Sequence, residues 1–324
     1  MSDLLKNIDA RTKLAGTNKL EILLFSLGLD KNSGRREHFG INVFKVREVM
    51  RTPEITKAPE MPESVEGMVS LRGVLVPIID LASYAGIRTE SKPEIMIVSE
   101  YNGHTQGFLV EAVDTILRLD WSQMRVPPEM VSNNLRGLVT AVTELDDGKL
   151  VMLLDVEKVL AETNKTDDSH EFKTLQPEPE LIGKTVFFAD DSVVARKQIE
   201  RTLDTLKIKW VQAINGKKAW DELLRMANQA EMLGKSIRDE VHLILTDVEM
   251  PEMDGYMLTK QVRSDPRFHG IPILMHSSLS GMSNQKLGLS VGVDAYVAKF
   301  EPHRLGESVC KMIRQGLQNR VKPL

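Results

Sequence analysis

The sequence predicts a two-domain protein, with an all-β unit first and an α/β unit containing a five-stranded parallel sheet second. Three observations predict this division. The length of 324 residues is typical of two domains. Short strand patterns separated by turn signals fill the first half, whereas near-continuous apolar runs alternate with helix patterns in the second. Between them, residues 162–180 are poor in apolar side chains and contain six acidic residues against two lysines.

The acidic stretch marks the expected boundary between the two units. It ends with Pro177 and Pro179, and its composition is typical of a solvated, partly extended linker. The alternative is an acidic surface loop within one large domain, but loops of this length are rare inside compact domains. The expected parts are an N-terminal helical segment at 1–19, a β domain at 20–163, an acidic linker at 164–182 and an α/β domain at 183–317.

Seven runs in the N-terminal domain have the length and composition of strands. They lie at 21–27, 38–44, 73–79, 94–99, 105–110, 115–119 and 150–154. Turn signals at 102–103 and 146–148 separate several of them. Helix patterns are sparse and lie at 4–8, 46–50 and 156–161. Many short strands joined by short turns are typical of a sandwich or a barrel.

The C-terminal domain contains five near-continuous apolar runs, the pattern of strands that are buried on both faces. They lie at 186–189, 211–213, 243–245, 273–275 and 295–298. Apolar residues at helix spacing follow Ser192, which is a suitable N-cap, and Gly234 is a stop signal after a long second helix. Five strand–helix units predict a doubly wound parallel sheet with right-handed crossovers.

Composition excludes several classes of protein. The net charge of −4 and the pI of 6.0 argue against a nucleic-acid-binding protein, which would carry a basic patch. No apolar run reaches the length of a membrane span, and the N-terminus lacks the apolar core of a secretory signal. The single cysteine, Cys310, allows no intrachain disulfide. These features predict a cytoplasmic protein without direct membrane insertion.

Polar side chains follow four of the five strands expected in the C-terminal domain. Asp190 and Asp191 follow the first, Asp247 follows the third, Ser277 ends the fourth and Lys299 follows the fifth. Ligands of such sheets bind where strands end and helices begin. Neighbouring carboxylates repel one another unless they hold a proton or a cation, and a donor set made only of oxygens suits Mg²⁺. Mg²⁺, an ammonium and a hydroxyl can together stabilise a phosphoryl group in transfer, with Asp247 as the best candidate nucleophile.

The segments FFADDS, LILTDVEMPEMDGY, PILMHSS and DAYVAKF resemble the receiver domain of two-component response regulators. The resemblance covers about residues 183–317 and implies a flavodoxin-like fold. It implies that Asp247 accepts a phosphoryl group from a phosphohistidine, with Lys299 and Ser277 as the other catalytic residues. The family pattern departs at one place, because Lys299 is followed by Phe300 rather than by proline.

The same resemblance implies a metal site and a switch. The implied Mg²⁺ ligands are Asp190, Asp191, Asp247 and the backbone carbonyl of Glu249. Tyr296 occupies the position of an aromatic switch residue whose rotamer follows Ser277. Taken singly, an Asp-Asp pair is more often a helix N-cap and a lysine a surface charge. The joint occurrence at four strand ends favours the functional interpretation.

The N-terminal domain contains no recognisable catalytic constellation, and His38 and His104 stand alone. The segments FGINVFKVREVM, ITKAPEMPESVEGMVSLRGVLVPIIDL and GFLVEAVDTILRL resemble the CheW-type chemotaxis coupling domain over about residues 20–163. This resemblance implies two small five-stranded β-barrels packed together. It also implies that Arg72, Val46 and Glu48 are candidate contacts for a receptor or kinase. The structural alternatives are a surface ion pair for Arg72 and core packing for Val46.

The order of the two domains resembles the CheV type of chemotaxis coupling proteins. The resemblance implies a cytoplasmic scaffold, not an enzyme, that links methyl-accepting chemoreceptors to a CheA-type histidine kinase at membrane-associated receptor arrays. It implies Mg²⁺ as cofactor and tuning by phosphorylation of Asp247. The alternative is a phosphate sink that competes for phosphoryl groups of the kinase without changing the coupling.

Overall fold

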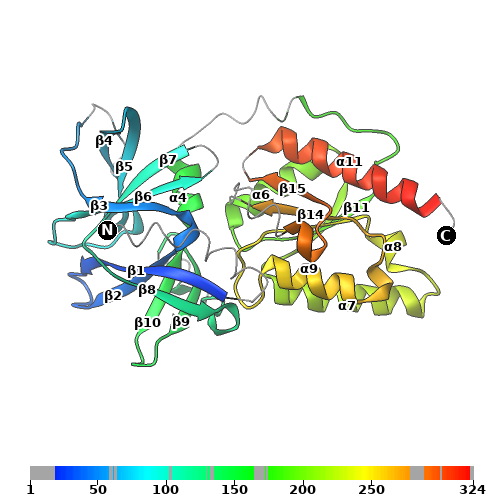
Figure 1. Cartoon of the computed structure of the whole chain (residues 1–324), viewed down its shortest axis with the longest axis horizontal. Helices are drawn as coiled ribbons and strands as arrows, with labels where there is room; N and C mark the ends of the chain where they lie inside the picture. Colours follow the sequence, from blue (N-terminus) through cyan, green and yellow to red (C-terminus); the bar gives the residue numbers. More distant parts are fainter. Residues whose placement is uncertain are drawn as a thin grey trace. The chain divides into compact units, whose positions relative to one another are not determined.

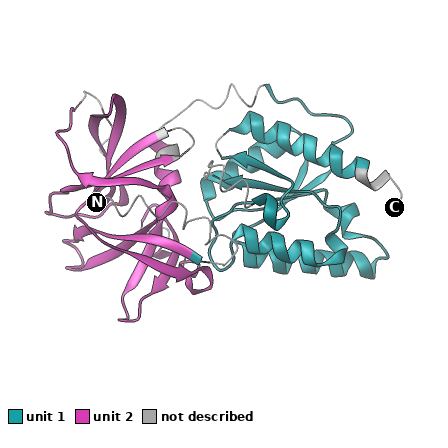
Figure 2. Cartoon of the chain, in the orientation of Figure 1, with its two compact units in different colours: residues 1–19, 164–324 teal, residues 20–163 magenta. Residues whose placement is uncertain are grey.

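The computed structural model describes residues 19–57, 61, 64–101, 104–128, 130–131, 135–163, 172, 174–277, 288–299 and 301–321. The chain divides into two compact units, one of residues 20–163 and one that contains the described residues from 172 onward (Figure 2). The expected helical segment at 1–19 lies outside the described residues except for Lys19, which begins a strand. None of the helices within the described part of the chain is long and apolar enough to cross a membrane.

The N-terminal unit contains two five-stranded sheets, the number of sheets and strands that the CheW resemblance implied (Figure 1). The first has the strand order β8-β1-β2-β10-β9. Its strands are β1 (Lys19–Leu29), β2 (Arg36–Asn42), β8 (Ala112–Asp120), β9 (Val139–Glu144) and β10 (Leu150–Leu154). The second has the order β3-β6-β7-β5-β4. Its strands are β3 (Val46–Arg51), β4 (Val65–Leu71), β5 (Val74–Asp80), β6 (Ile95–Tyr101) and β7 (His104–Val110).

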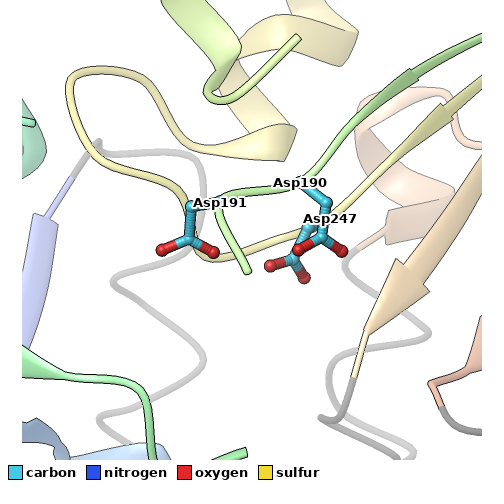
Figure 3. A group of neighbouring side chains, drawn as sticks. All are labelled: Asp190, Asp191 and Asp247. Carbon is cyan, nitrogen blue, oxygen red and sulfur yellow. The ribbon is translucent and has the colours of Figure 1, made fainter. Parts of the chain in front are cut away.

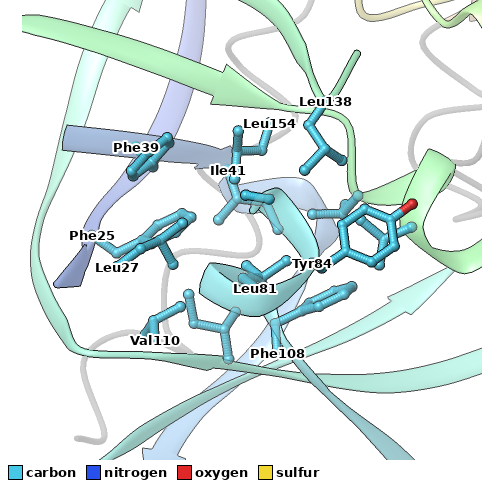
Figure 4. Packing of buried hydrophobic residues seen from close by; sticks show 14 of the residues in the cluster. Phe25, Leu27, Phe39, Ile41, Leu81, Tyr84, Phe108, Val110, Leu138 and Leu154 are labelled. Carbon is cyan, nitrogen blue, oxygen red and sulfur yellow. The ribbon is translucent and has the colours of Figure 1, made fainter. Parts of the chain in front are cut away.

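Among the described residues of this unit, three apolar clusters are found, because the central strands are buried on both faces. In β1, Leu20, Ile22 and Leu24 face a cluster inside the first sheet, whereas Leu23, Phe25 and Leu27 face a second cluster. That second cluster also contains residues of the other sheet, such as Phe108, and of two helices, α2 (Leu81–Ala85) and α4 (Val156–Thr163) (Figure 4). The second sheet encloses a third cluster with Val76 and Ile78. Each sheet therefore has its own core, and a shared core joins the two.

The helix predicted at 46–50 is wrong, because this segment forms strand β3. Val46, Val49 and Met50 have the i, i+3, i+4 spacing of a helix, but β3 pairs antiparallel with β6, and Val49 lies opposite Ile97. The strand lies at the edge of its sheet and is only partly buried, so it shows little of the apolar alternation of a strand. The pairing of neighbouring strands decided the local structure here.

The C-terminal unit is the doubly wound α/β fold that the sequence predicts. All four strand pairings are parallel and the strand order is β12-β11-β13-β14-β15. The strands are β11 (Thr185–Ala189), β12 (Lys209–Ala213), β13 (Leu243–Thr246), β14 (Ile273–Ser277) and β15 (Ala295–Ala298). The helices include α6 (Val193–Thr205), α7 (Gly216–Met232), α8 (Ile237–Glu240), α9 (Gly255–Ser264) and α11 (Pro302–Val321). Helices α6 and α11 cover one face of the sheet, and α7 and α9 cover the other (Figure 1).

The described residues of the segment 164–182 pack against the C-terminal unit. Phe172, Leu175 and Leu181 are buried and belong to the apolar cluster between the sheet and helices α6 and α11. The carboxylate of Glu178 forms an ion pair with Arg314 of α11, with an Oε2–Nη1 distance of 2.5 Å. This part of the acidic segment is therefore packed rather than solvated, because it contributes three apolar side chains to the core.

The single cysteine gives a direct test of this packing. Burial raises the pKa of the Cys310 thiol to about 11, from an ordinary value of 9.0, and the nearby Glu178 carboxylate acts in the same direction. We expect the native thiol to react far more slowly with a thiol reagent at pH 8 than the thiol of the urea-unfolded chain. Because the unfolded thiol loses its proton first, the free energy of unfolding should fall as the pH rises from 9 toward 11. Equal reaction rates in the two states would contradict this packing.

Candidate functional site

The site lies where the chain leaves two neighbouring strands of the parallel sheet. Strands β11 and β13 are adjacent, and the strand order reverses direction at this place, which is where ligands of doubly wound sheets bind. Asp190 and Asp191 follow β11, and Asp247 follows β13. Figure 3 shows their three carboxylates gathered at this edge of the sheet. One carboxylate oxygen from each residue lies within 4.8 Å of the others, so the structure brings together the three acids that the sequence predicts.

A buried lysine bridges two of these acids. The Nζ atom of Lys299, at the end of β15, lies 2.9 Å from Oδ2 of Asp247 and 3.0 Å from Oδ2 of Asp190. The Lys299 side chain is 1% exposed and that of Asp190 is fully buried. Three carboxylates and one ammonium leave an excess of two negative charges, and burial makes this excess expensive. A divalent cation would neutralise it.

Backbone amides next to the two buried acids fix the directions of their carboxylates. The amide of Val248 donates to Oδ1 of Asp247 at 2.7 Å, and the amide of Ser192 donates to Oδ1 of Asp190 at 2.9 Å. Each of these carboxylates therefore has one oxygen bound to its own loop and the other directed to Lys299. The N-cap of α6 that the sequence predicts is confirmed, since the Ser192 side chain accepts a hydrogen bond from the amide of Ala195.

The donor set fits Mg²⁺ better than it fits a softer metal. The three acids of the cluster offer only oxygen atoms, and Mg²⁺ prefers carboxylate oxygens with remaining positions for water and phosphate. The carbonyl of Glu249 was expected to be a further ligand. Glu249 lies two residues after Asp247 in the loop between β13 and α9, and the role of its carbonyl stays a prediction.

Gly255, the first residue of α9, lets the Asp247 loop pass close to the helix. A Cβ atom at this position would lie 1.9 Å from the backbone carbonyl oxygen of Asp247. Gly255→Ala should therefore displace this loop and lower the free energy of unfolding by about 3 kcal/mol, measured by urea denaturation. Gly288→Ala is the matched control, because its Cβ would lie no closer than 3.7 Å to another residue. Similar stabilities of the two variants would contradict the prediction.

The predicted switch residues lie beside the acid cluster. Ser277 is fully buried at the end of β14, and its side chain forms a hydrogen bond with the hydroxyl of Tyr296 on the neighbouring strand β15. Burial raises the pKa of the Tyr296 hydroxyl well above its ordinary value, and the charges of Asp247 and Glu249 act in the same direction. Tyr296 is therefore a neutral hydrogen-bonding group at physiological pH, in contact with the proposed phosphoryl-binding hydroxyl.

Two residues that the sequence did not single out also contact the site. The His276 ring is fully buried, and its Nδ1 lies 3.9 Å from Oδ2 of Asp190. The guanidinium of Arg196 in α6 donates to the backbone carbonyls of Asp190 and Asp191 at 2.8 and 2.9 Å. The sequence carries no signal for the Arg196 contact, because its partners are backbone carbonyls, which every residue has.

In the N-terminal unit, the three candidate contact residues have different environments. Arg72 lies in the turn between β4 and β5 with a φ of 52°, and its guanidinium forms an ion pair with Glu48 at 2.9 Å. The Arg72 side chain is 72% exposed and that of Glu48 is 27% exposed. Val46 is buried and belongs to the shared core. Arg72 thus forms the surface ion pair that was its structural alternative, and Val46 has the packing role that was its own alternative. A contact of these residues with a receptor or kinase stays a prediction.

Comparisons with known proteins assign both units. Residues 21–164 match the CheW-like domain family, and residues 186–309 match the response regulator receiver domain family. The chain is 29% identical over 301 residues to the chemotaxis protein CheV3 of Helicobacter pylori, which covers 91% of this chain and 95% of that protein. It is 32% identical over 153 residues to the chemotaxis protein CheW of Klebsiella aerogenes, covering 46% of this chain and 87% of that protein. It is 36% identical over 122 residues to the chemotaxis protein CheY1 of Helicobacter pylori, covering 37% of this chain and 89% of that protein.

Proposed function

Because the chain belongs to the CheV type of chemotaxis proteins, in which a CheW-like domain precedes a receiver domain, we propose that it is an adaptor tuned by phosphorylation at Asp247. The observation that carries the proposal is the contact of Lys299 with both Asp247 and Asp190 inside a cluster of three acids. Such a cluster of opposite charges at the carboxyl ends of adjacent strands suits the transfer of a phosphoryl group.

The phosphoryl donor in this proposal is a phosphohistidine of a CheA-type histidine kinase. The carboxylate of Asp247 attacks the phosphorus atom, the phosphorus–nitrogen bond breaks, and the imidazole leaves with its electron pair. Asp190, Asp191, Asp247 and the Glu249 carbonyl would hold Mg²⁺, which when bound supplies charge neutralisation for the phosphoryl oxygens. The ammonium of Lys299 exchanges its contact with the Asp247 carboxylate for a phosphoryl oxygen. The Ser277 hydroxyl, at the end of β14, donates to another.

The switch follows from the same contacts. A phosphoryl group adds a charge of about −1.5 to −2 at pH 7 and three strong acceptor oxygens. Ser277 then has a new partner and exchanges its hydrogen bond with Tyr296 for one to the phosphoryl group. The loss of that bond shifts the balance between two arrangements of the Tyr296 side chain. We infer that this change in the arrangement of the Tyr296 side chain transmits the phosphorylation of Asp247 to the rest of the protein.

The CheW-like domain supplies the coupling in this proposal. Methyl-accepting chemoreceptors and the kinase would bind its surface, and the exposed ion pair of Arg72 and Glu48 is one place for such a contact. The start of β5, close to Arg72 in the chain, also exposes Val74 and Leu75, which would give such a surface an apolar part. The protein works as a scaffold in the cytoplasm at receptor arrays, and its receiver domain promotes only its own phosphorylation and dephosphorylation.

Kinase activity in reconstituted receptor arrays tests the proposal. Arrays would contain receptor, kinase and either the wild-type chain or Asp247→Ala, and the rate of ATP consumption would be measured before and after phosphorylation reaches a steady state. We expect the activity to change with phosphorylation in wild-type arrays and to stay constant in Asp247→Ala arrays. Equal activity in both, together with labelling of wild-type Asp247, would instead show a phosphate sink. Absence of any wild-type labelling would overturn the proposal.

A further inference from the structure

We propose that Arg196 is a positioning residue for the metal site of the receiver domain, an inference that rests on the proposed function. One guanidinium nitrogen, Nη1, donates to the carbonyl of Asp190 at 2.8 Å and to that of Asp191 at 2.9 Å. Arg196 belongs to α6, and its own backbone amide donates to the carbonyl of Ser192. The loop that carries two of the three acids is therefore fixed to the helix that follows it.

The contact has a consequence for the direction of the two carboxylates. The carbonyls of Asp190 and Asp191 are held toward α6, so the peptide groups that follow these two residues cannot rotate. The two side chains therefore stay directed toward Asp247. Partners of metal ligands typically contribute a factor of about 10 to 100 in metal affinity by such orientation. A purely electrostatic role would have the opposite sign, because a positive charge near the site repels Mg²⁺.

The sign of the change in Mg²⁺ affinity distinguishes the two roles. For the full chain, Mg²⁺ binding would be measured by calorimetry for wild type, Arg196→Met, Arg196→Lys and Lys197→Met. Lys197 is exposed on the same helix and controls for the lost charge. We expect Arg196→Met to bind Mg²⁺ about tenfold or more weakly than wild type, Arg196→Lys to lie between them, and Lys197→Met to match wild type.

Each other outcome of this titration contradicts the inference. Tighter or equal binding by Arg196→Met would overturn the positioning role. If the wild-type chain takes up no Mg²⁺, the proposed function itself fails, and the two failures are thereby distinguished. Circular dichroism and thermal unfolding of each variant would show that the receiver domain remains folded during the measurement.

A second, independent observation concerns the segment before the receiver domain. We infer that residues 172 and 174–181, here called the strap, are a conformational device that sets the reach between the two domains. The strap lies on a stripe of α11 made by Gly306, Cys310 and Arg314, which are spaced by four residues and therefore share one face of the helix. A Cβ atom on Gly306 would lie 2.6 Å from the Leu175 side chain, so the absence of a side chain there makes room for the strap.

A cation–π contact and an ion pair add to the apolar packing of the strap. The guanidinium of Arg201 in α6 lies 4.0 Å from the centre of the Phe172 ring, and Glu178 forms an ion pair with Arg314 at 2.5 Å. On the other side, α4 is anchored in the CheW-like domain by the buried Val156 and Val159 and ends at Thr163. With the strap bound, only residues 164–171 connect these two anchors.

The strap therefore changes the maximum separation of the anchors. Eight residues span at most about 30 Å when extended, whereas release of the strap up to residue 181 would more than double this reach. The strap also packs on a helix that is connected to the phosphorylation site, because α11 begins three residues after Lys299. We infer that exchange of the Lys299 contact from Asp247 to a phosphoryl group moves α11 and loosens the strap, a step that rests on the proposed function.

Hydrogen exchange of the full chain tests the strap. Peptides covering 172–181 would be followed in wild type, Leu175→Ser and Ile182→Ser, each with and without Mg²⁺ and beryllium fluoride, which mimics the phosphoryl group. We expect Leu175→Ser to accelerate exchange of the strap about tenfold, whereas Ile182→Ser, at an exposed position, leaves it unchanged. In the wild-type chain, beryllium fluoride should also accelerate hydrogen exchange of the strap.

Binding of the strap to α11 and its response to phosphorylation are contradicted by different results. Exchange of the wild-type strap as fast as that of the urea-unfolded chain would show that the strap is not bound. Protection that is unaffected by beryllium fluoride, in a chain whose Asp247 region becomes protected by it, would overturn the link to phosphorylation. If the Asp247 region itself does not respond, the proposed function fails, while the response of the strap to Leu175→Ser still decides whether it is bound.

Discussion

Asp247→Asn should accept phosphoryl groups from a phosphorylated histidine kinase at an initial rate that is lower than that of wild type by about a thousandfold or more. The amide has the shape of the carboxylate and keeps an oxygen that can accept the hydrogen bond from Val248, but it has no charge and is a poor nucleophile. The measurement is transfer of labelled phosphate from the kinase to the full chain, resolved by gel electrophoresis, with excess Mg²⁺ in every reaction.

Asp254→Asn is the matched control for this experiment. Asp254 is a buried acid in the loop between β13 and α9, where its side chain caps α9 by accepting from the amide of Met257. Asparagine caps a helix as well as aspartate does, so this variant should be labelled at the wild-type rate. If Asp247→Asn were labelled as fast as the control, another residue would have to be the acceptor.

The receiver half of the site could be predicted from sequence because its chemistry lies at strand ends. Buried parallel strands produce apolar runs that are easy to recognise, and the first polar residue after each run falls at one edge of the sheet. Asp190, Asp191 and Asp247 are brought together in this way. The choice of Lys299 as their ion-pair partner follows from the same topology, since β15 ends at the same edge.

Contacts made through backbone atoms and through the linker could not be predicted in this way. Arg196 binds carbonyl groups, which every residue possesses, so no pattern of residue types indicates this contact. In the acidic segment, the average composition indicates a solvated linker. Its apolar residues, Phe172, Leu175 and Leu181, become significant only because α11 offers a glycine, Gly306, opposite one of them.

The N-terminal domain was predicted less completely, because its strands depend on their neighbours. Strands β4 and β9 were missed, although β9 alternates between buried and less buried residues along Val139–Glu144. β4 contains Gly67, which has a φ of 148° and lies at an irregularity in the pairing with β5. The edge strand β3 has a helix-like spacing of apolar residues. The pairing that defines these three strands is long-range information, which a local pattern does not contain.

Lys299→Met should have the second largest effect, because it removes the positive charge from a buried cluster of three acids. The Lys299 side chain is 1% exposed and lies 2.9 and 3.0 Å from Asp247 and Asp190. Breaking a buried ion pair by removing one partner typically costs about 3–5 kcal/mol of stability, because the remaining charge is uncompensated. The rate of phosphoryl transfer should also fall, by a factor of about 100 to 1,000, since the developing charge loses a preorganised donor.

Mg²⁺ should affect the two properties of this variant differently. Without the ammonium, the cluster carries an additional uncompensated negative charge, so Mg²⁺ should bind more tightly to Lys299→Met than to wild type. Urea denaturation at increasing Mg²⁺ should therefore show a recovery of stability that is larger than in wild type. The rate of phosphoryl transfer should stay low at every Mg²⁺ concentration, because the metal does not replace the ammonium at the phosphoryl oxygen.

Lys209→Met provides the comparison, since Lys209 is an exposed lysine at the opposite end of the same sheet, at the start of β12. It removes the same charge from the whole chain and should leave both stability and labelling within error of wild type. Suppose that Lys299→Met and Lys209→Met had the same free energy of unfolding, with the same dependence on Mg²⁺. The carboxylates of the acid cluster would then have to be neutral in the metal-free protein. The acid cluster would then hold protons instead of a cation, and its affinity for Mg²⁺ would fall steeply with decreasing pH.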